Sequence, residues 1–422
     1  MSQLYRVFFI VVIVFAFTAT GVTQDLEIAG QYRGETELFS NDSSYAHQHW
    51  INLVLEKSLG QSARMHMNVE MNTYGNGTIT PLMQEASVCY YTNHIDYRFG
   101  KQLVSWGSAY KLNPTSYFNP YDLTIVTPGE KRLGIIAATA RYYGPARIEI
   151  AGILSPFFTS HQMPPGAGEQ MIQQTVLQTL HEMNQSIPIS AISVAMDPAN
   201  PFVSPEVEPN LENTSGGIQL TKRGLLNTDV SLSAYHGRDK FMTVEEEMTE
   251  ESIFLATQDP SQIDTLATVY FIYPEVNRIG LDIIGTAGDV GFWIEGTYSI
   301  YSKAYQSDVM TIVTGADYRF ANDIYLVAQG IYNTGKTPEQ EDMKAIMGYV
   351  SKPIFGFHDI EFMGLYDAET ESYFLQPQFR YSLGNAVALE FGGTLVHLEG
   401  GYASLFSRMI SDRLYARLTI DF

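Results

Sequence analysis

Three charged side chains, Asp96, Arg98 and Arg141, could act together on a charged solute. Asp96 and Arg98 fall on one face of an expected strand over 95–100, because side chains along a strand alternate between its two faces. Arg141 falls on the polar face of a later strand. The chemistry of such a group is electrostatic, since fixed charges beside a narrow passage select small solutes by charge and size.

The segment after this strand is built to hold a shape. It contains Trp106 and two Asn-Pro pairs that begin at Asn113 and Asn119, and it ends near Asp122. Asn-Pro favours turns and keeps the preceding residue extended, so we expect a stiff loop over 105–130 that folds inward. Two interpretations of the charges stay open. They either select solutes together with this loop, or they form salt bridges that fill a wall.

Two other motifs in the sequence lack the residues that their chemistry would require. The string from Gly330 to Thr337 matches the phosphate-binding pattern, but Pro338 follows where a helix would have to begin. His47 and His49 share a strand face without an evident third metal ligand. We therefore predict no catalytic residues, no metal, no cofactor and no enzyme activity.

The elements that position these residues are strands with one apolar and one polar face. The last ten residues show the pattern well, with Leu418, Ile420 and the terminal Phe422 on the apolar face and Arg417 and Thr419 on the other. Such a strand suits a barrel that has lipid outside and water inside. It also resembles the C-terminal strand that the outer-membrane assembly machinery recognises, and we expect it to pair with the first strand.

Segments of this kind recur along the chain, and their connections alternate between short and long. The long ones, chiefly 105–130, 155–213 and 237–262, all fall at the same end. The sequence therefore predicts an all-β fold, a transmembrane antiparallel up-and-down β-barrel of about 18 strands, with about 16 left open. Helical spacing predicts one short helix at 168–186 in a long extracellular loop, either as a surface helix or as a plug.

The N-terminal residues predict export. Arg6 precedes an uncharged run from Val7 to Phe17, and small residues follow it. This pattern is typical of a secretory signal peptide, here residues 1–24, which leaves 25–422 as a single barrel. The net charge of −21 argues against a nucleic-acid partner. A single Cys excludes a disulfide framework, and an aromatic content of 13% suits an aromatic-girdled barrel.

A family resemblance rests on the strand and loop described first. The string from Phe99 to Gly107, followed by Asn113–Asp122 and joined by the C-terminal Phe422 strand, is similar to that of porin-like Gram-negative outer-membrane barrels. More distantly it resembles alginate-export-type proteins, although this chain is not rich in Lys and Arg. The resemblance implies a channel and supplies no solute.

We therefore expect a channel in the bacterial outer membrane that passes small or hydrophobic solutes through a loop-constricted lumen. The alternative is a non-conducting structural, adhesin or receptor barrel sealed by the 155–213 loop. The expected partners are outer-membrane lipid and lipopolysaccharide and the barrel-assembly machinery, and a homo-oligomer stays open.

Overall fold

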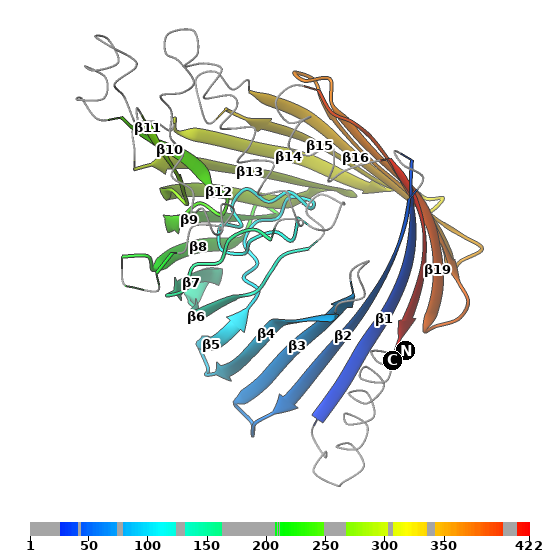
Figure 1. The fold of residues 1–422 in the computed structure, drawn as a ribbon. Coiled ribbons are helices and arrows are strands. Elements are labelled where there is room, and N and C mark those ends of the chain that lie inside the picture. The colour runs from blue at the N-terminus through cyan, green and yellow to red at the C-terminus, as the bar shows by residue number, and fades with distance from the viewer. Residues whose placement is uncertain are drawn as a thin grey trace, which may run out of the picture.

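The structure is a computed structural model, and its described residues form a closed β-barrel (Figure 1). It describes residues 26–40, 44–73, 79–123, 131–162, 207–208, 210, 212–248, 267–302, 307–335, 342–399 and 412–422. The predicted signal peptide and the predicted helix at 168–186 lie outside these residues. In the ranges described, no helix is both long and apolar enough to cross a membrane.

The barrel wall is one antiparallel sheet of 18 strands, β1–β9 and β12–β20. β10 and β11 form a separate two-stranded sheet, and η1 is a single short 3₁₀ turn at Pro145–Arg147. The strands are β1 (Leu26–Phe39), β2 (Tyr45–Ser58), β3 (Ala63–Thr73), β4 (Ile79–Tyr91), β5 (Ile95–Gln102), β6 (Ile135–Tyr143), β7 (Ile148–Ser155), β8 (Ser215–Leu225), β9 (Thr228–Arg238), β10 (Thr243–Met248), β11 (Ala267–Ile272), β12 (Glu275–Ala287), β13 (Val290–Tyr301), β14 (Val309–Arg319), β15 (Tyr325–Asn333), β16 (Met343–Ile354), β17 (His358–Asp367), β18 (Tyr373–Ser382), β19 (Val387–His397) and β20 (Arg413–Asp421).

The first and last strands close the barrel, as expected from the sequence. β1 pairs with β20 from Gln31 opposite Asp421 to Phe39 opposite Arg413. Phe422 extends the pairing, because its amide donates to the Gly30 carbonyl at 2.9 Å and its own carbonyl accepts from Gly30 at 2.7 Å. Closure leaves the barrel sheet without a free edge, which a lipid environment requires of a β-structure.

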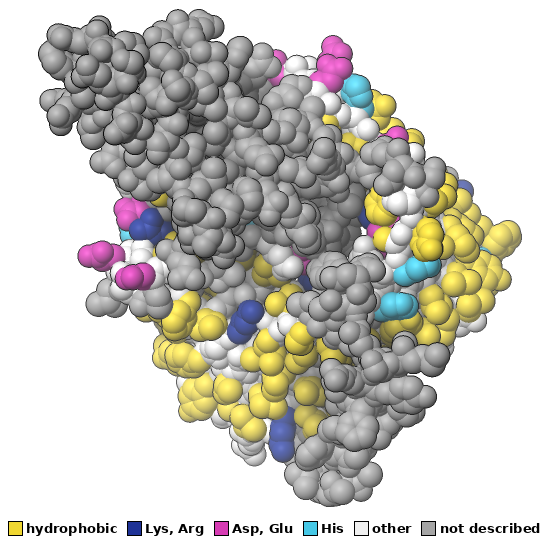
Figure 2. All heavy atoms as spheres, in the orientation of Figure 1, with side chains coloured by type: hydrophobic (Ala, Val, Ile, Leu, Met, Phe, Trp, Pro, Cys, Tyr) yellow, Lys and Arg dark blue, Asp and Glu magenta, His cyan; other side chains and the backbone are white. Residues whose placement is uncertain are grey.

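The outer face of the wall is apolar. Large apolar side chains stay exposed on strand after strand, as at Leu232 (β9), Ile279 (β12), Ile346 (β16) and Leu414 (β20). Figure 2 shows hydrophobic side chains gathered over the visible part of the wall. Exposure of so much apolar surface is costly in water but favourable in hydrocarbon. The barrel therefore spans a membrane.

Connections at one end of the barrel are all short, and the long connections all lie at the other end. β12 and β13 are joined by two residues, whereas 103–134 joins β5 to β6 and 156–214 joins β7 to β8. The alternation predicted from the sequence is thus found in the strand order. The count is 18, and the region 263–286 holds two strands, of which only β12 belongs to the wall. The hairpin of β10 and β11 lies partly within the loop predicted at 237–262, so that loop is not wholly irregular.

Candidate functional site

The connection between β5 and β6 turns into the barrel (Figure 1). Its rings Trp106, Tyr117 and Phe118 are almost fully buried, and they pack in one cluster with inward-facing residues of the wall. Tyr235 of β9 lies 5.0 Å from Phe118 and 5.4 Å from Tyr117, between ring centroids. The segment that follows β5 therefore packs on the inner face of the wall at β6, β7, β9 and β12–β16.

The buried carboxylate of Glu295, on β13, is the main anchor of this connection. The amides of Ser108 and Ala109 donate to Glu295 Oε2 at 3.0 and 2.9 Å. The amide and the hydroxyl of Thr115 both donate to Oε1 at 2.7 Å. Because a charged acceptor makes strong hydrogen bonds at a buried site, this carboxylate holds both arms of the loop.

Gly107 makes this approach feasible. Its φ is +83°, and a Cβ there would lie 2.4 Å from Glu295 Oε1. Only glycine adopts such a backbone without strain and also leaves room for the carboxylate. The loop thus wraps closely around the Glu295 side chain.

Further polar contacts fix the tip of the loop. The amide of Tyr110 donates to Gln329 Oε1 at 3.1 Å, and Gln329 Nε2 donates back to the Tyr110 carbonyl at 3.2 Å. Trp293 Nε1 donates to the same Gln329 oxygen at 2.8 Å. Ser108 Oγ donates to Asp282 on β12. These contacts bind the loop to β12 and β15, in addition to the Glu295 contacts on β13.

Tyr117 packs against β12 at Gly280, which has no side chain. A Cβ on Gly280 would lie 2.0 Å from the Tyr117 hydroxyl, so glycine there permits the close approach. The hydroxyl lies 3.1 Å from Ser233 Oγ and 3.4 Å from Thr297 Oγ1. Burial raises the pKa of Tyr117, although these hydrogen bonds act the other way, so the phenol stays neutral.

The predicted residues Asn113, Asn119 and Asp122 bind the connection itself. Asn119 accepts from the Val104 amide and donates to the Leu133 carbonyl, both at 2.7 Å, which ties the two ends of the connection together. Asn113 donates to the Ala109 carbonyl at 2.6 Å. Asp122 lies 3.4 Å from the Lys131 ammonium. Asn119 and Asp122 are almost fully buried, so here they shape the loop.

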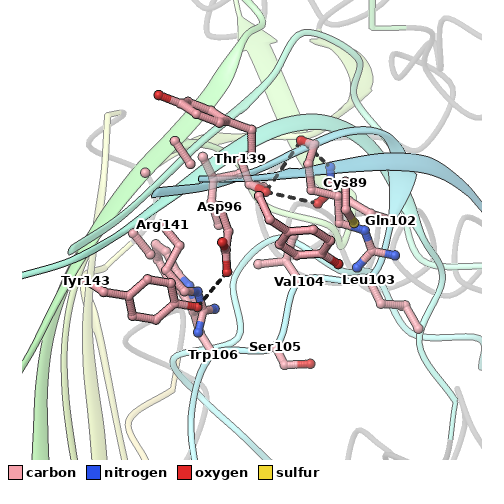
Figure 3. Close-up of a pocket in the computed structure, with 17 residues that line it drawn as sticks. Cys89, Asp96, Gln102, Leu103, Val104, Ser105, Trp106, Thr139, Arg141 and Tyr143 are labelled. Carbon is pink, nitrogen blue, oxygen red and sulfur yellow. Dashed lines mark hydrogen bonds between the residues drawn. The ribbon is translucent and has the colours of Figure 1, made fainter. Parts of the chain in front are cut away.

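Asp96, Arg98, Trp106 and Arg141 line one cavity of about 170 Å³ between the wall and the start of the connection. Asp96 and Arg141 lie opposite each other on β5 and β6. Figure 3 shows both side chains at this cavity, with Trp106 and Ser105 below them. The sequence thus predicted four residues that the fold brings together.

Each of these charges has a partner. Arg98 Nη2 lies 2.8 Å from Glu85 Oε1, and Arg141 Nη1 lies 2.8 Å from Glu149 Oε1. Asp96 accepts a hydrogen bond of 2.9 Å from the Tyr143 hydroxyl. The salt-bridge interpretation of the wall charges therefore holds for both arginines, while all three groups still border the cavity.

The sequence did not single out Glu295, Asp282 or Gln329 as functional. Alternation places all three on the inward face, but nothing local to them indicates that their partner is a loop 174–219 residues away. Within the described part of the chain, no group of three or more His, Cys, Asp or Glu side chains could hold a metal ion.

A closed 18-stranded barrel with an apolar exterior and a loop folded onto its inner wall defines a porin-like transmembrane barrel of the bacterial outer membrane. Solved structures agree on the fold. OccK11 (OpdR) of Pseudomonas aeruginosa aligns over 94% of this chain and 96% of its own, with 9% identity and a TM-score of 0.52. OccAB1 of Acinetobacter baumannii covers 94% and 95%, with 8% identity and a TM-score of 0.51.

A mutant of the Rh. blastica porin aligns less well, with a TM-score of 0.42, 12% identity, and coverage of 94% of this chain and 100% of its own. No protein-family model and no curated protein matches the chain. The resemblance to porin-like barrels is thus confirmed for the fold, and the more distant resemblance to alginate exporters stays a prediction.

Proposed function

We propose that the protein is a passive outer-membrane channel, in which small or hydrophobic solutes diffuse through a lumen narrowed by the 103–134 connection. The observation that carries this proposal is the position of that connection. Glu295 holds it against β13, and its side chains pack on inward-facing residues of β9 and β12–β16. A loop that folds inward and packs on the inner wall narrows the lumen of the barrel.

Conductance in planar lipid bilayers tests the proposal. The purified protein should insert, resist SDS unfolding until heated, and give discrete current steps. A barrel that passes the SDS test but carries no current would favour the second candidate, a non-conducting structural, adhesin or receptor barrel sealed by the 155–213 loop. That candidate rests on the length of this connection between β7 and β8.

We predict that the cavity bordered by Asp96, Arg98 and Arg141 contributes to ion selectivity. Arg98→Gln with Arg141→Gln should shift the permeability ratio toward cations by about twofold, since charges exposed to water interact by roughly 0.2–1 kcal/mol. Asp96→Asn should shift it the other way. The reversal potential in a KCl gradient measures both changes.

Arg319→Gln is a control for the loss of one arginine, because Arg319 is the last residue of β14 and does not line the cavity. If the reversal potential stays at the wild-type value in all variants, the charges at this cavity do not contribute to ion selectivity. Association of copies into a homo-oligomer, contacts with lipopolysaccharide and recognition of Phe422 by the assembly machinery remain predictions.

A further inference from the structure

A second cavity, of about 440 Å³, lies on the other side of the connection. It is bounded by residues 112–121 of the connection, by Asp239, Lys240 and Phe241 after β9, and by the inner faces of β12–β16. Ligand pockets in proteins have volumes of about 300–1,000 Å³, so this space could hold a small organic molecule.

The wall of this cavity is apolar, although the inside of a membrane barrel is usually polar. Val309 and Val313 of β14, Ile331 of β15 and Met343 of β16 all line it. The same strip continues along these strands through Val327, Ala345 and Met347, where Ala109, Tyr110 and Leu112 of the connection pack on it. The connection therefore covers one part of an apolar strip and leaves the other part facing the cavity.

Lys240 supplies a positive charge at this apolar space. It is only 7% exposed, and its ammonium lies 4.7 Å from the centre of the Phe158 ring. In the described part of the chain it makes no salt bridge. Its charged neighbours are matched to each other, because Arg278 lies 3.3 Å from Asp239, which also accepts a 2.5 Å hydrogen bond from Tyr301. The cavity thus carries an excess positive charge.

Burial lowers the pKa of Lys240 to about 7, chiefly by desolvation and further through the nearby Arg278, while Asp239 acts the other way. The charged form is disfavoured because burial removes water from the ammonium, and Asp239 offsets this only in part. An acid group bound at the ammonium would offset that cost.

We propose that this cavity binds an organic monoanion with an apolar body, such as a short alkyl carboxylate. The acid group lies at Lys240, and the alkyl chain lies against Val309, Ile331 and Met343. A neutral or cationic molecule of the same shape lacks the first contact. A larger polar anion cannot make the second. The inference deepens the proposed channel function, since it names a class of solute for the lumen.

Calorimetric titration of the protein in lipid nanodiscs, with empty nanodiscs subtracted, tests the site without requiring conduction. The probes are hexanoate, hexan-1-ol and hexylammonium. Hexanoate should bind wild-type protein more tightly than either of the others. Lys240→Met should weaken hexanoate binding about tenfold and leave hexanol unchanged, because only the charged contact is lost.

Lys344→Met is the matched control, since Lys344 carries the same charge on an exposed position at the rim and pairs with Glu369. Hexanoate binding should not change in it. Met343→Trp is a second variant, which fills the apolar end of the cavity while keeping Lys240, and it should also weaken hexanoate binding. The heat-dependent SDS-gel shift verifies that each variant is folded.

The inference is overturned by a folded wild-type protein that does not bind hexanoate, by hexanol binding as tightly as hexanoate, or by equal losses in the Lys240 and Lys344 variants. If Lys240→Met does not fold, the inference is still tested by comparing the three probes on wild-type protein and by hexanoate binding to Met343→Trp. Hexanoate binding without conductance would support this binding site and contradict the proposed channel function. Conductance without hexanoate binding would support the channel function and contradict the binding site.

Discussion

Glu295→Ala is expected to release the connection between β5 and β6 from the barrel wall and to raise single-channel conductance. The variant leaves the buried amides of Ser108, Ala109 and Thr115 without their acceptor. Each unsatisfied buried donor costs about 1–3 kcal/mol, so the docked loop should lose at least ~3 kcal/mol relative to an undocked one. Current steps should become larger and noisier, and a protease should cut the connection faster.

The matched control is Glu37→Ala, which removes an equally buried inward carboxylate and the same charge. Glu37 pairs with Arg413 and Gln48 and makes no contact with the connection in the residues described. Gly107→Ala approaches the same contact without changing charge, because its Cβ would meet the Glu295 carboxylate. It should reproduce the larger conductance in part. If Glu295→Ala and Glu37→Ala gave the same current steps, Glu295 would not be the anchor.

The barrel could be predicted from the sequence because the features that specify it lie within each strand and each connection. Alternation in each segment sets which face meets lipid, and the length of each connection sets the end at which it lies. The terminal strand shows this: Leu414 and Phe422 are exposed outward, while Tyr415 and Thr419 are buried inward. Local alternation also placed Asp96, Arg98 and Arg141 on the inward face.

The position of the connection on the inner wall could not be predicted, because it depends on contacts between residues far apart in the chain. Glu295 and Thr115 are separated by 180 residues, and the contact exists only once the loop is folded. A signal was nevertheless present in β14. Val309 and Val313 lie on the inward face and Met310 and Ile312 on the outward face, so both faces are apolar there. Loss of alternation within a barrel strand indicates that something covers the inner face.

The hairpin of β10 and β11 was missed for a different reason. Its first strand, Thr243–Met248, carries three consecutive Glu residues and lies within the long loop predicted at 237–262. Charged residues do not favour strands intrinsically, but pairing with Ala267–Ile272 supplies the backbone hydrogen bonds. The pairing partner is again distant in sequence, so only the folded chain reveals it.

Arg417→Met is expected to lower the free energy of unfolding by about 3–5 kcal/mol, because it removes the shortest ion pair of two buried carboxylates and leaves them only the longer pairs with Arg33 and Arg380. Arg417 lies on β20, inside the barrel at the closure of β20 with β1 and β19. Its Nε donates to Glu35 Oε2 at 2.5 Å on β1, and its Nη1 donates to Glu390 Oε1 at 2.6 Å on β19. Both carboxylates are 4% exposed.

One guanidinium therefore joins three strands across the seam where the first and last strands meet. Arg380→Met is the control, since Arg380 lies 3.9 Å from the same Glu390 and is more exposed, so its loss should cost much less. Arg417→Lys keeps the charge but lacks the planar fork that reaches two carboxylates, and it should fall between the two. The temperature at which the SDS-gel mobility shifts, together with guanidinium unfolding in lipid vesicles, ranks the variants. Equal stability of Arg417→Met and Arg380→Met would mean that β1 and β20 are held by their backbone ladder alone, and that the buried charges at the seam contribute no net stability to closure.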